Sequence, residues 1–167
     1  SADIEIDYDL AFDLDQGYTI CGWYWLDSAP LNPNPTIFSK MDITGASQNW
    51  WIYADNSGFL TWAWTNANAD PPLNYAVNHR DSSWHHFAAV STSNTHILYI
   101  DGLQRAISTT TATTDTPADD LYIGSRIVAA VNTDYWDGKL DDLRIYNRGL
   151  SPVEIYEIFN GTDVSWP

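Results

Sequence analysis

Short runs rich in Ile, Val, Tyr, Trp and Thr recur along the chain, and clusters of Asn, Asp, Gly and Pro separate them. This alternation of strand-forming and turn-forming segments is typical of an all-β protein with short strands. The sequences DNSG at 55–58 and DG at 101–102 predict hairpin turns, because Gly adopts the backbone dihedrals that such turns require. The predicted strands are residues 4–7, 18–26, 36–40, 50–54, 59–65, 73–78, 84–92, 96–101, 104–109, 121–125 and 139–147.

One helix is predicted near the end of the chain, in 151-SPVEIYEIFNG-161. Ser151 is the expected N-cap, Pro152 fits the first helical position, and Glu154 completes a capping box. Gly161 then ends the helix. About eleven short strands and one helix predict an all-β fold, a two-sheet antiparallel jelly-roll sandwich with one short C-terminal helix. No repeat or linker divides the sequence, so residues 1–167 are expected to form a single domain.

The segment 50-WWIYADNSGFLTWAW-64 places four of the nine tryptophans around one turn. If residues 55–58 form that turn, Tyr53 pairs with Leu60 and Trp51 pairs with Trp62. Side chains alternate across a sheet, so each face of the hairpin carries every second residue. One face is then Trp51, Tyr53, Leu60, Trp62 and Trp64, and the other is Trp50, Ile52, Phe59, Thr61 and Ala63.

The ring-rich face of this hairpin is expected to look outward. The other face is mixed and aliphatic, which suits a sandwich core about 10 Å thick. Buried indole N–H groups need partners, whereas exposed rings on a concave outer face can stack on the flat apolar faces of sugars. A register shift of one residue would exchange the two faces, and this alternative stays open.

Composition and charge narrow the classes of partner. The chain has 22 acidic and 7 basic residues, a net charge of −15, which repels nucleic acid and favours cations. No apolar run reaches the roughly 20 residues of a membrane span. The single cysteine, Cys21, excludes an intrachain disulfide and a cysteine-based zinc site, and its apolar strand predicts a buried thiol.

Several segments carry a resemblance to a known family: 18-YTICGWYWLD-27, 84-WHHFAAV-90, 98-LYIDGLQ-104, 121-LYIGS-125 and 138-GKLDDLRIYNRGLSPVEI-155. In this order they resemble the bacterial laminin G-like domains of the concanavalin A-like lectin/glucanase jelly-roll superfamily. The resemblance implies the fold, but members serve as lectins, adhesion modules and enzymes. Such domains usually begin with a further strand ahead of the segment DIEI. That strand is expected to be missing or to come from elsewhere. Because SADIEI has no signal-peptide pattern, the domain is expected to be excised from a larger secreted protein.

The resemblance also refines the candidate ligand contacts. Residues 60 and 62 of such domains often point inward, whereas smaller residues are usual at 51 and 64, so Trp51 and Trp64 are the better candidates. A rim residue is usual at Trp25. Loops 66–75 and 126–136 interleave amides, carboxylates and rings, although ordinary turn formation also explains them. The candidate ligand-binding residues are Trp25, Trp51, Tyr53, Trp64, Asn66, Asp70, Asn74, Tyr75, Arg126, Tyr135 and Trp136.

A metal is a further expectation. Alternation along 140-LDDLRIYN-147 places Asp141 on one face with Leu143 and Ile145, and a carboxylate on an apolar face must be paired or metal-bound. Arginine or backbone N–H groups could be its partners. The resemblance adds Ca²⁺ in a structural role, with Asp3 or Asp142 as co-ligands. The histidines form no metal motif; His79 stands in a loop and is expected to be exposed.

Catalysis is not expected. Retaining glycosidases of this fold carry two carboxylates on one strand as E-x-D-x-x-E, and neither that motif nor a lyase motif is present. The prediction is an extracellular, non-catalytic carbohydrate-binding module that recognises a glycan or polysaccharide by aromatic stacking. A parent multidomain enzyme or adhesin is the expected context. The alternative is an extracellular protein-binding or adhesion domain of the same fold, with calcium at the contact.

Overall fold

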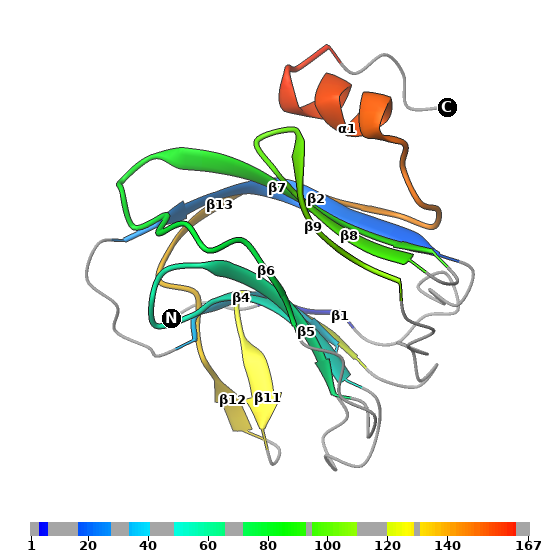
Figure 1. The fold of residues 1–167 in the computed structure, drawn as a ribbon. Helices are drawn as coiled ribbons and strands as arrows, with labels where there is room; N and C mark the ends of the chain where they lie inside the picture. Colours follow the sequence, from blue (N-terminus) through cyan, green and yellow to red (C-terminus); the bar gives the residue numbers. More distant parts are fainter. Residues whose placement is uncertain are drawn as a thin grey trace.

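Two antiparallel β-sheets pack face to face and one helix lies outside them (Figure 1). The computed structural model describes residues 4–6, 17–27, 34–40, 49–65, 72–92, 95–109, 120–128 and 131–162. In spatial order, the six-stranded sheet contains β1 (Ile4–Ile6), β10 (Leu121–Ile123), β3 (Thr36–Lys40), β4 (Asn49–Ala54), β5 (Leu60–Thr65) and β6 (Leu73–Asn74). The five-stranded sheet contains β13 (Gly138–Tyr146), β2 (Tyr18–Leu26), β7 (Trp84–Thr92), β8 (Thr95–Ile100) and β9 (Leu103–Ser108).

The predicted all-β sandwich is confirmed, and several strand bounds agree with the sequence pattern. β2, β3 and β7 coincide with the predicted ranges, whereas β6 is only two residues long. A separate hairpin of β11 (Arg126–Val128) and β12 (Val131–Thr133) lies within the predicted 126–136 loop. Strands of three residues are too short for alternation to reveal them.

The register of the β4–β5 hairpin differs from the predicted one by one residue. Ala54 pairs with Leu60 and Ile52 with Trp62, so Phe59 belongs to the turn. The Asp55 side chain fixes this longer turn, because its carboxylate accepts hydrogen bonds from the Ser57 and Phe59 amides at 2.8 and 3.0 Å. The placement of Leu60 and Trp62 on the outer face is therefore wrong.

The inner face of the hairpin is part of the core. Trp50, Ile52, Leu60 and Trp62 are fully buried, and the Tyr18 ring stacks on Trp50 with centroids 5.7 Å apart. Trp51 pairs with Ala63 and Tyr53 with Thr61, on the opposite face. The register places Trp64 opposite Trp50 rather than in the row of Trp51, and the Trp64 side chain lies outside the described residues.

A β-bulge changes the alternation along β13. Asp141 pairs with Trp23, but Arg144 pairs with Cys21, which leaves one extra residue on β13. Asp142 takes a positive φ of 47° at this point. Beyond the bulge Leu143 packs into the core, whereas Asp141 is exposed. The predicted shared face of Asp141 with Leu143 and Ile145 is therefore wrong, because a bulge reverses side-chain parity.

The helix α1 (Pro152–Phe159) confirms the predicted capping box. Ser151 Oγ accepts a hydrogen bond from the Glu154 amide, and the Glu154 carboxylate accepts one from the Ser151 amide. Ile155 and Ile158 are buried in a cluster with Cys21 on the outer face of the five-stranded sheet, so the expected buried thiol is confirmed. None of the described helices is long and apolar enough to cross a membrane.

Candidate functional site

Two adjacent rings form a flat surface on the outer face of the six-stranded sheet. Trp51 and Tyr53 stand two residues apart on β4, both partly exposed, and their rings stack with centroids 5.8 Å apart and planes at 27°. Their cross-strand partners on β5, Ala63 and Thr61, are small. The predicted outward placement of Trp51 and Tyr53 is confirmed.

Arg126 completes this surface from the β11–β12 hairpin. Its guanidinium carbon lies 5.2 Å from the centroid of the Trp51 ring, and Nη2 forms an ion pair with Asp134 at 2.5 Å. Among the described residues, Arg126 Nε has no hydrogen-bond partner. A cation is attracted to the face of an aromatic ring, so this interaction holds Arg126 against Trp51. We call Trp51, Tyr53 and Arg126 the aromatic shelf.

The shelf is fixed from below and carries polar groups at its border. Trp51 packs against the buried side chains of Tyr122 and Ile127, which restricts its ring. Burial and the nearby Asp55 raise the pKa of Tyr53, so its hydroxyl remains a neutral donor at ordinary pH. β6 continues the row of Tyr53 and Thr61 with Asn74, which is exposed.

The other predicted aromatic contacts lie away from the shelf. Trp25 is on the outer face of the opposite sheet, edge-on to Trp84, with the Lys139 amine 4.8 Å from its centroid. Trp136 packs edge-on against the buried Tyr24 and donates a hydrogen bond to the Lys139 carbonyl.

Four further predicted polar or aromatic contacts complete this comparison. Tyr135 is half-buried beside Trp136 in sequence. Tyr75 lies beneath the Arg105 guanidinium, 4.7 Å from its carbon. Asn66 and Asp70 lie outside the described residues.

The predicted calcium ligands are engaged elsewhere. Asp142 accepts two hydrogen bonds from Arg144, at 2.9 Å from Nε and 2.8 Å from Nη2, and Asp141 accepts one from the Asp142 amide. These two carboxylates as they stand do not fit a calcium ligand pair. Within the described part of the chain, no group of three or more His, Cys, Asp or Glu residues is arranged to hold a metal. Asp3 lies outside it, so calcium stays a prediction.

Two stacked histidines lie beside the buried core residue Tyr24. His79 is 3% exposed, so its predicted exposure is wrong. Its Nδ1 is hydrogen-bonded to the Tyr24 hydroxyl, and its ring stacks on His85 with centroids 4.4 Å apart. Burial lowers the pKa of His79 to about 4, with a smaller contribution from His85. The hydrogen bonds that the His85 ring donates to the carboxylates of Asp101 and Asp81 raise the pKa of His85 despite its partial burial.

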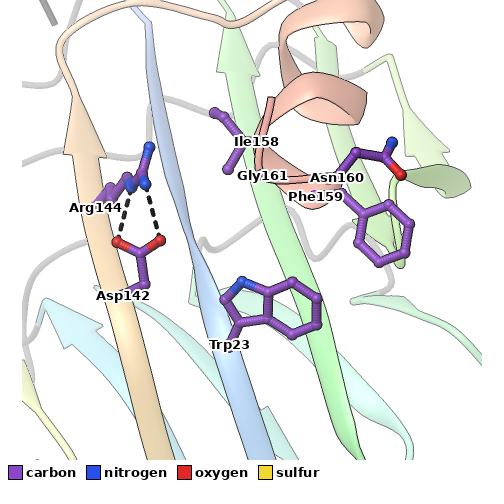
Figure 2. Close-up of a pocket in the computed structure, with 7 residues that line it drawn as sticks. All are labelled: Trp23, Asp142, Arg144, Ile158, Phe159, Asn160 and Gly161. Atoms are coloured by element: carbon purple, nitrogen blue, oxygen red, sulfur yellow. Dashed lines mark hydrogen bonds and ion pairs between the residues drawn. The ribbon is translucent and has the colours of Figure 1, made fainter. Parts of the chain in front are cut away.

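A pocket that the sequence did not reveal lies on the opposite side of the molecule, at the end of α1 (Figure 2). Its volume is about 460 Å³. In the sequence, the acidic and basic residues two positions apart on one strand, Asp142 and Arg144, are the feature that could have indicated it. The residues that line it are Trp23, Asp142, Arg144, Ile158, Phe159, Asn160 and Gly161.

Comparison with known proteins gives the family. The family model described as "Concanavalin A-like lectin/glucanases superfamily", of laminin G type, matches residues 1–156. The chain belongs to this family. No curated protein matches this concanavalin A-like chain.

Solved structures share the concanavalin A-like fold at low sequence identity. The Ruminococcus gnavus IT-sialidase CBM40 bound to α2,3-sialyllactose has a TM-score of 0.73 and 18% identity, over 95% of this chain and 97% of that one. The heptameric SAP-like pentraxin of Limulus polyphemus has a TM-score of 0.63 and 15% identity, over 86% and 70%. The binding domain of botulinum neurotoxin DC in complex with SialylT has a TM-score of 0.69 and 13% identity, over 96% and 39%. At these identities, the similarity shows the jelly-roll fold.

Proposed function

We propose that this domain is a non-catalytic carbohydrate-binding module and that a glycan lies against the aromatic shelf. The observation that carries the proposal is the stacked pair of Trp51 and Tyr53 on an outward sheet face. Two adjacent rings whose planes differ by 27° offer apolar area to the face of a sugar. Because packing already restricts the Trp51 ring, binding costs less side-chain entropy.

Polar groups around the platform supply the remaining recognition. Arg126 carries a charged guanidinium over the Trp51 ring, Tyr53 carries a neutral hydroxyl, and Asn74 is exposed at the border. A small-ligand site combines apolar contact with a few such groups. The net charge of −15 favours a neutral glycan, but Arg126 provides one position at which a sugar carboxylate could pair.

The structural neighbours support this class of ligand. The Ruminococcus gnavus module with the same fold is bound to α2,3-sialyllactose, and the toxin domain is in complex with SialylT. The proposal includes an extracellular setting and a larger parent protein, because single weak sites gain affinity when they are tethered. We expect a dissociation constant of about 10⁻³ to 10⁻⁵ M, equivalent to roughly 4–7 kcal/mol.

Titration calorimetry against a panel of neutral polysaccharides, lactose and sialyllactose tests the proposal. Trp51→Ala and Tyr53→Ala should each weaken binding by about 1 kcal/mol, or roughly fivefold, because each removes one stacking surface. Trp84→Ala is the matched control, since Trp84 is 40% exposed but lies on the other sheet. Arg126→Gln should weaken sialyllactose more than lactose.

Binding that survives both shelf substitutions would remove the stacking mechanism. A panel without any glycan ligand would favour the alternative of a protein-binding domain. That alternative has one supporting observation: another neighbour of the same fold is a toxin binding domain in complex with rat synaptotagmin II.

A further inference from the structure

The pocket at the end of α1 has the composition of a small-ligand site. It occupies about 460 Å³, within the range of roughly 300–1,000 Å³ that is usual for such sites. Strands β2 and β13 provide its sheet side and the last turn of α1 provides the other (Figure 2). It lies on the outer face of the five-stranded sheet, whereas the aromatic shelf is on the outer face of the six-stranded one.

Trp23 gives the pocket an aromatic floor with a fixed orientation. The indole is partly exposed, stacks on Phe159 with centroids 5.7 Å apart, and meets the His86 ring edge-on at 5.4 Å. His86 is fully buried, and burial lowers its pKa to about 4, so the layer beneath the indole is uncharged at neutral pH. A ligand that covers the exposed part of Trp23 would therefore bury apolar area without ordering a mobile ring.

The Asp142–Arg144 pair lines the pocket from β13, next to the strand that carries Trp23 (Figure 2). The two groups share two hydrogen bonds, and the Asp142 carboxylate keeps further lone pairs while 47% of its side chain is exposed. At the bulge Asp142 takes a φ of 47°, in the left-handed region that Gly, Asn and Asp adopt more readily than other residues. Strained positions and bulges are enriched where a side chain must be aimed at a ligand.

The chemistry of this pair selects the class of ligand. An anion would meet Asp142 and the carbonyl end of α1, and a cation would meet Arg144. A neutral ligand rich in hydroxyl groups can donate to the carboxylate and accept from the guanidinium edge at the same time. The Asn160 amide, whose Nδ2 donates to the Tyr156 carbonyl, adds one more polar group at the rim.

We propose that this pocket is a second saccharide site, which takes one neutral sugar residue against Trp23 and holds its hydroxyl groups with Asp142, Arg144 and Asn160. The inference comes from the pocket's own residues and does not depend on ligand binding at the shelf. With both sites occupied, one domain would contact glycan on two opposite faces.

The test uses the methyl glycosides of glucose, galactose and mannose as probes and follows the nine tryptophan indole N–H signals by two-dimensional NMR. The Trp23 signal is assigned with Trp23→Phe. It should shift saturably for at least one glycoside below about 50 mM, in the range of weak single-sugar sites.

Asp142→Asn should weaken this binding about tenfold, because it removes a charged hydrogen bond. Asn160→Ala, at a position outside the core, is a second variant that does not depend on the ion pair. Trp51→Ala should leave the Trp23 titration unchanged, which separates this site from the shelf. The proposal is overturned if no glycoside shifts the Trp23 signal, or if both folded pocket variants titrate like the parent. If the proposed glycan binding at the aromatic shelf is wrong, the Trp51 signal will not respond to the glycosides.

Discussion

Replacing His86 by Phe should make the fold less sensitive to acid. His86 is fully buried beside Trp23 and Phe159, and neither ring nitrogen has a hydrogen-bond partner among the described residues. Burial is the largest cause of its low pKa; Arg144 also lowers it, while Asp101 and Asp142 oppose the shift. The folded protein therefore resists a proton that the unfolded chain accepts readily.

The sign and size of the effect follow from linkage. The pKa of His86 is about 4 in the fold and about 6.5 in an unfolded chain. Its contribution to the free energy of unfolding is present above pH 6.5 and is lost as the pH falls toward 4. The loss is about 2 kcal/mol at pH 5 and about 3 kcal/mol at pH 4.

Urea unfolding at pH 7 and pH 5, followed by tryptophan fluorescence, measures this loss. His79 has the same lowered pKa and should contribute a similar share, so the parent loses stability from both residues. Between pH 7 and pH 5, the free energy of unfolding of His86→Phe should fall by about 2 kcal/mol less than that of the parent. Its stability at pH 7 depends on how well the larger ring fits, but the change with pH does not.

His85 provides a control of opposite sign. Its pKa is raised, so its stabilisation is present below about pH 6.5 and is lost as the pH rises through the folded pKa. His85→Gln should therefore steepen the loss of stability toward pH 5. Parallel pH profiles for the parent and His86→Phe would show that His86 is already protonated or hydrated in the fold, and would refute the reasoning.

Two substitutions test the local structure by urea midpoints. Ser151→Ala should lower the free energy of unfolding by about 1 kcal/mol, because it removes the N-cap of α1; an unchanged midpoint would contradict the capping role. Gly138→Ala should cost about 3 kcal/mol or more, because φ is 157° and a Cβ would lie 1.9 Å from the Trp25 carbonyl oxygen. Gly161→Ala, with φ of 65° and nothing within 4 Å, should cost only about 1 kcal/mol, and equal losses would rule out the steric explanation.

Elements fixed by local chemistry were predictable from sequence. The bounds of β2, β3 and β7 and the capping box of α1 follow from side-chain types within a few residues of one another. Register was not predictable in the same way. The Asp55 side chain lengthens the β4–β5 turn by one residue, and the bulge at Asp142 adds one residue to β13. Each single step exchanges the two faces of a strand.

The candidate site was therefore predicted only in part. Trp51 and Tyr53 face outward as expected, because parity along β4 itself is unaffected by the turn. Trp25 and Trp136 resemble them in sequence but belong to other surfaces, since sequence alone does not show which sheet a ring covers. The Trp23 pocket arises where β2, β13 and α1 meet, and no short window of sequence contains all three.

The β11–β12 hairpin pairs with neither of the two large sheets, yet it carries Arg126 to the shelf. Only one of its described side chains, Ile127, is buried. Exchanging the residues at 126 and 134 would therefore alter the charge above Trp51 without breaking a ladder of either sheet. For the sugar-binding shelf proposed above, selectivity could in this way be redesigned, or diverge between relatives, separately from the stability of the sandwich.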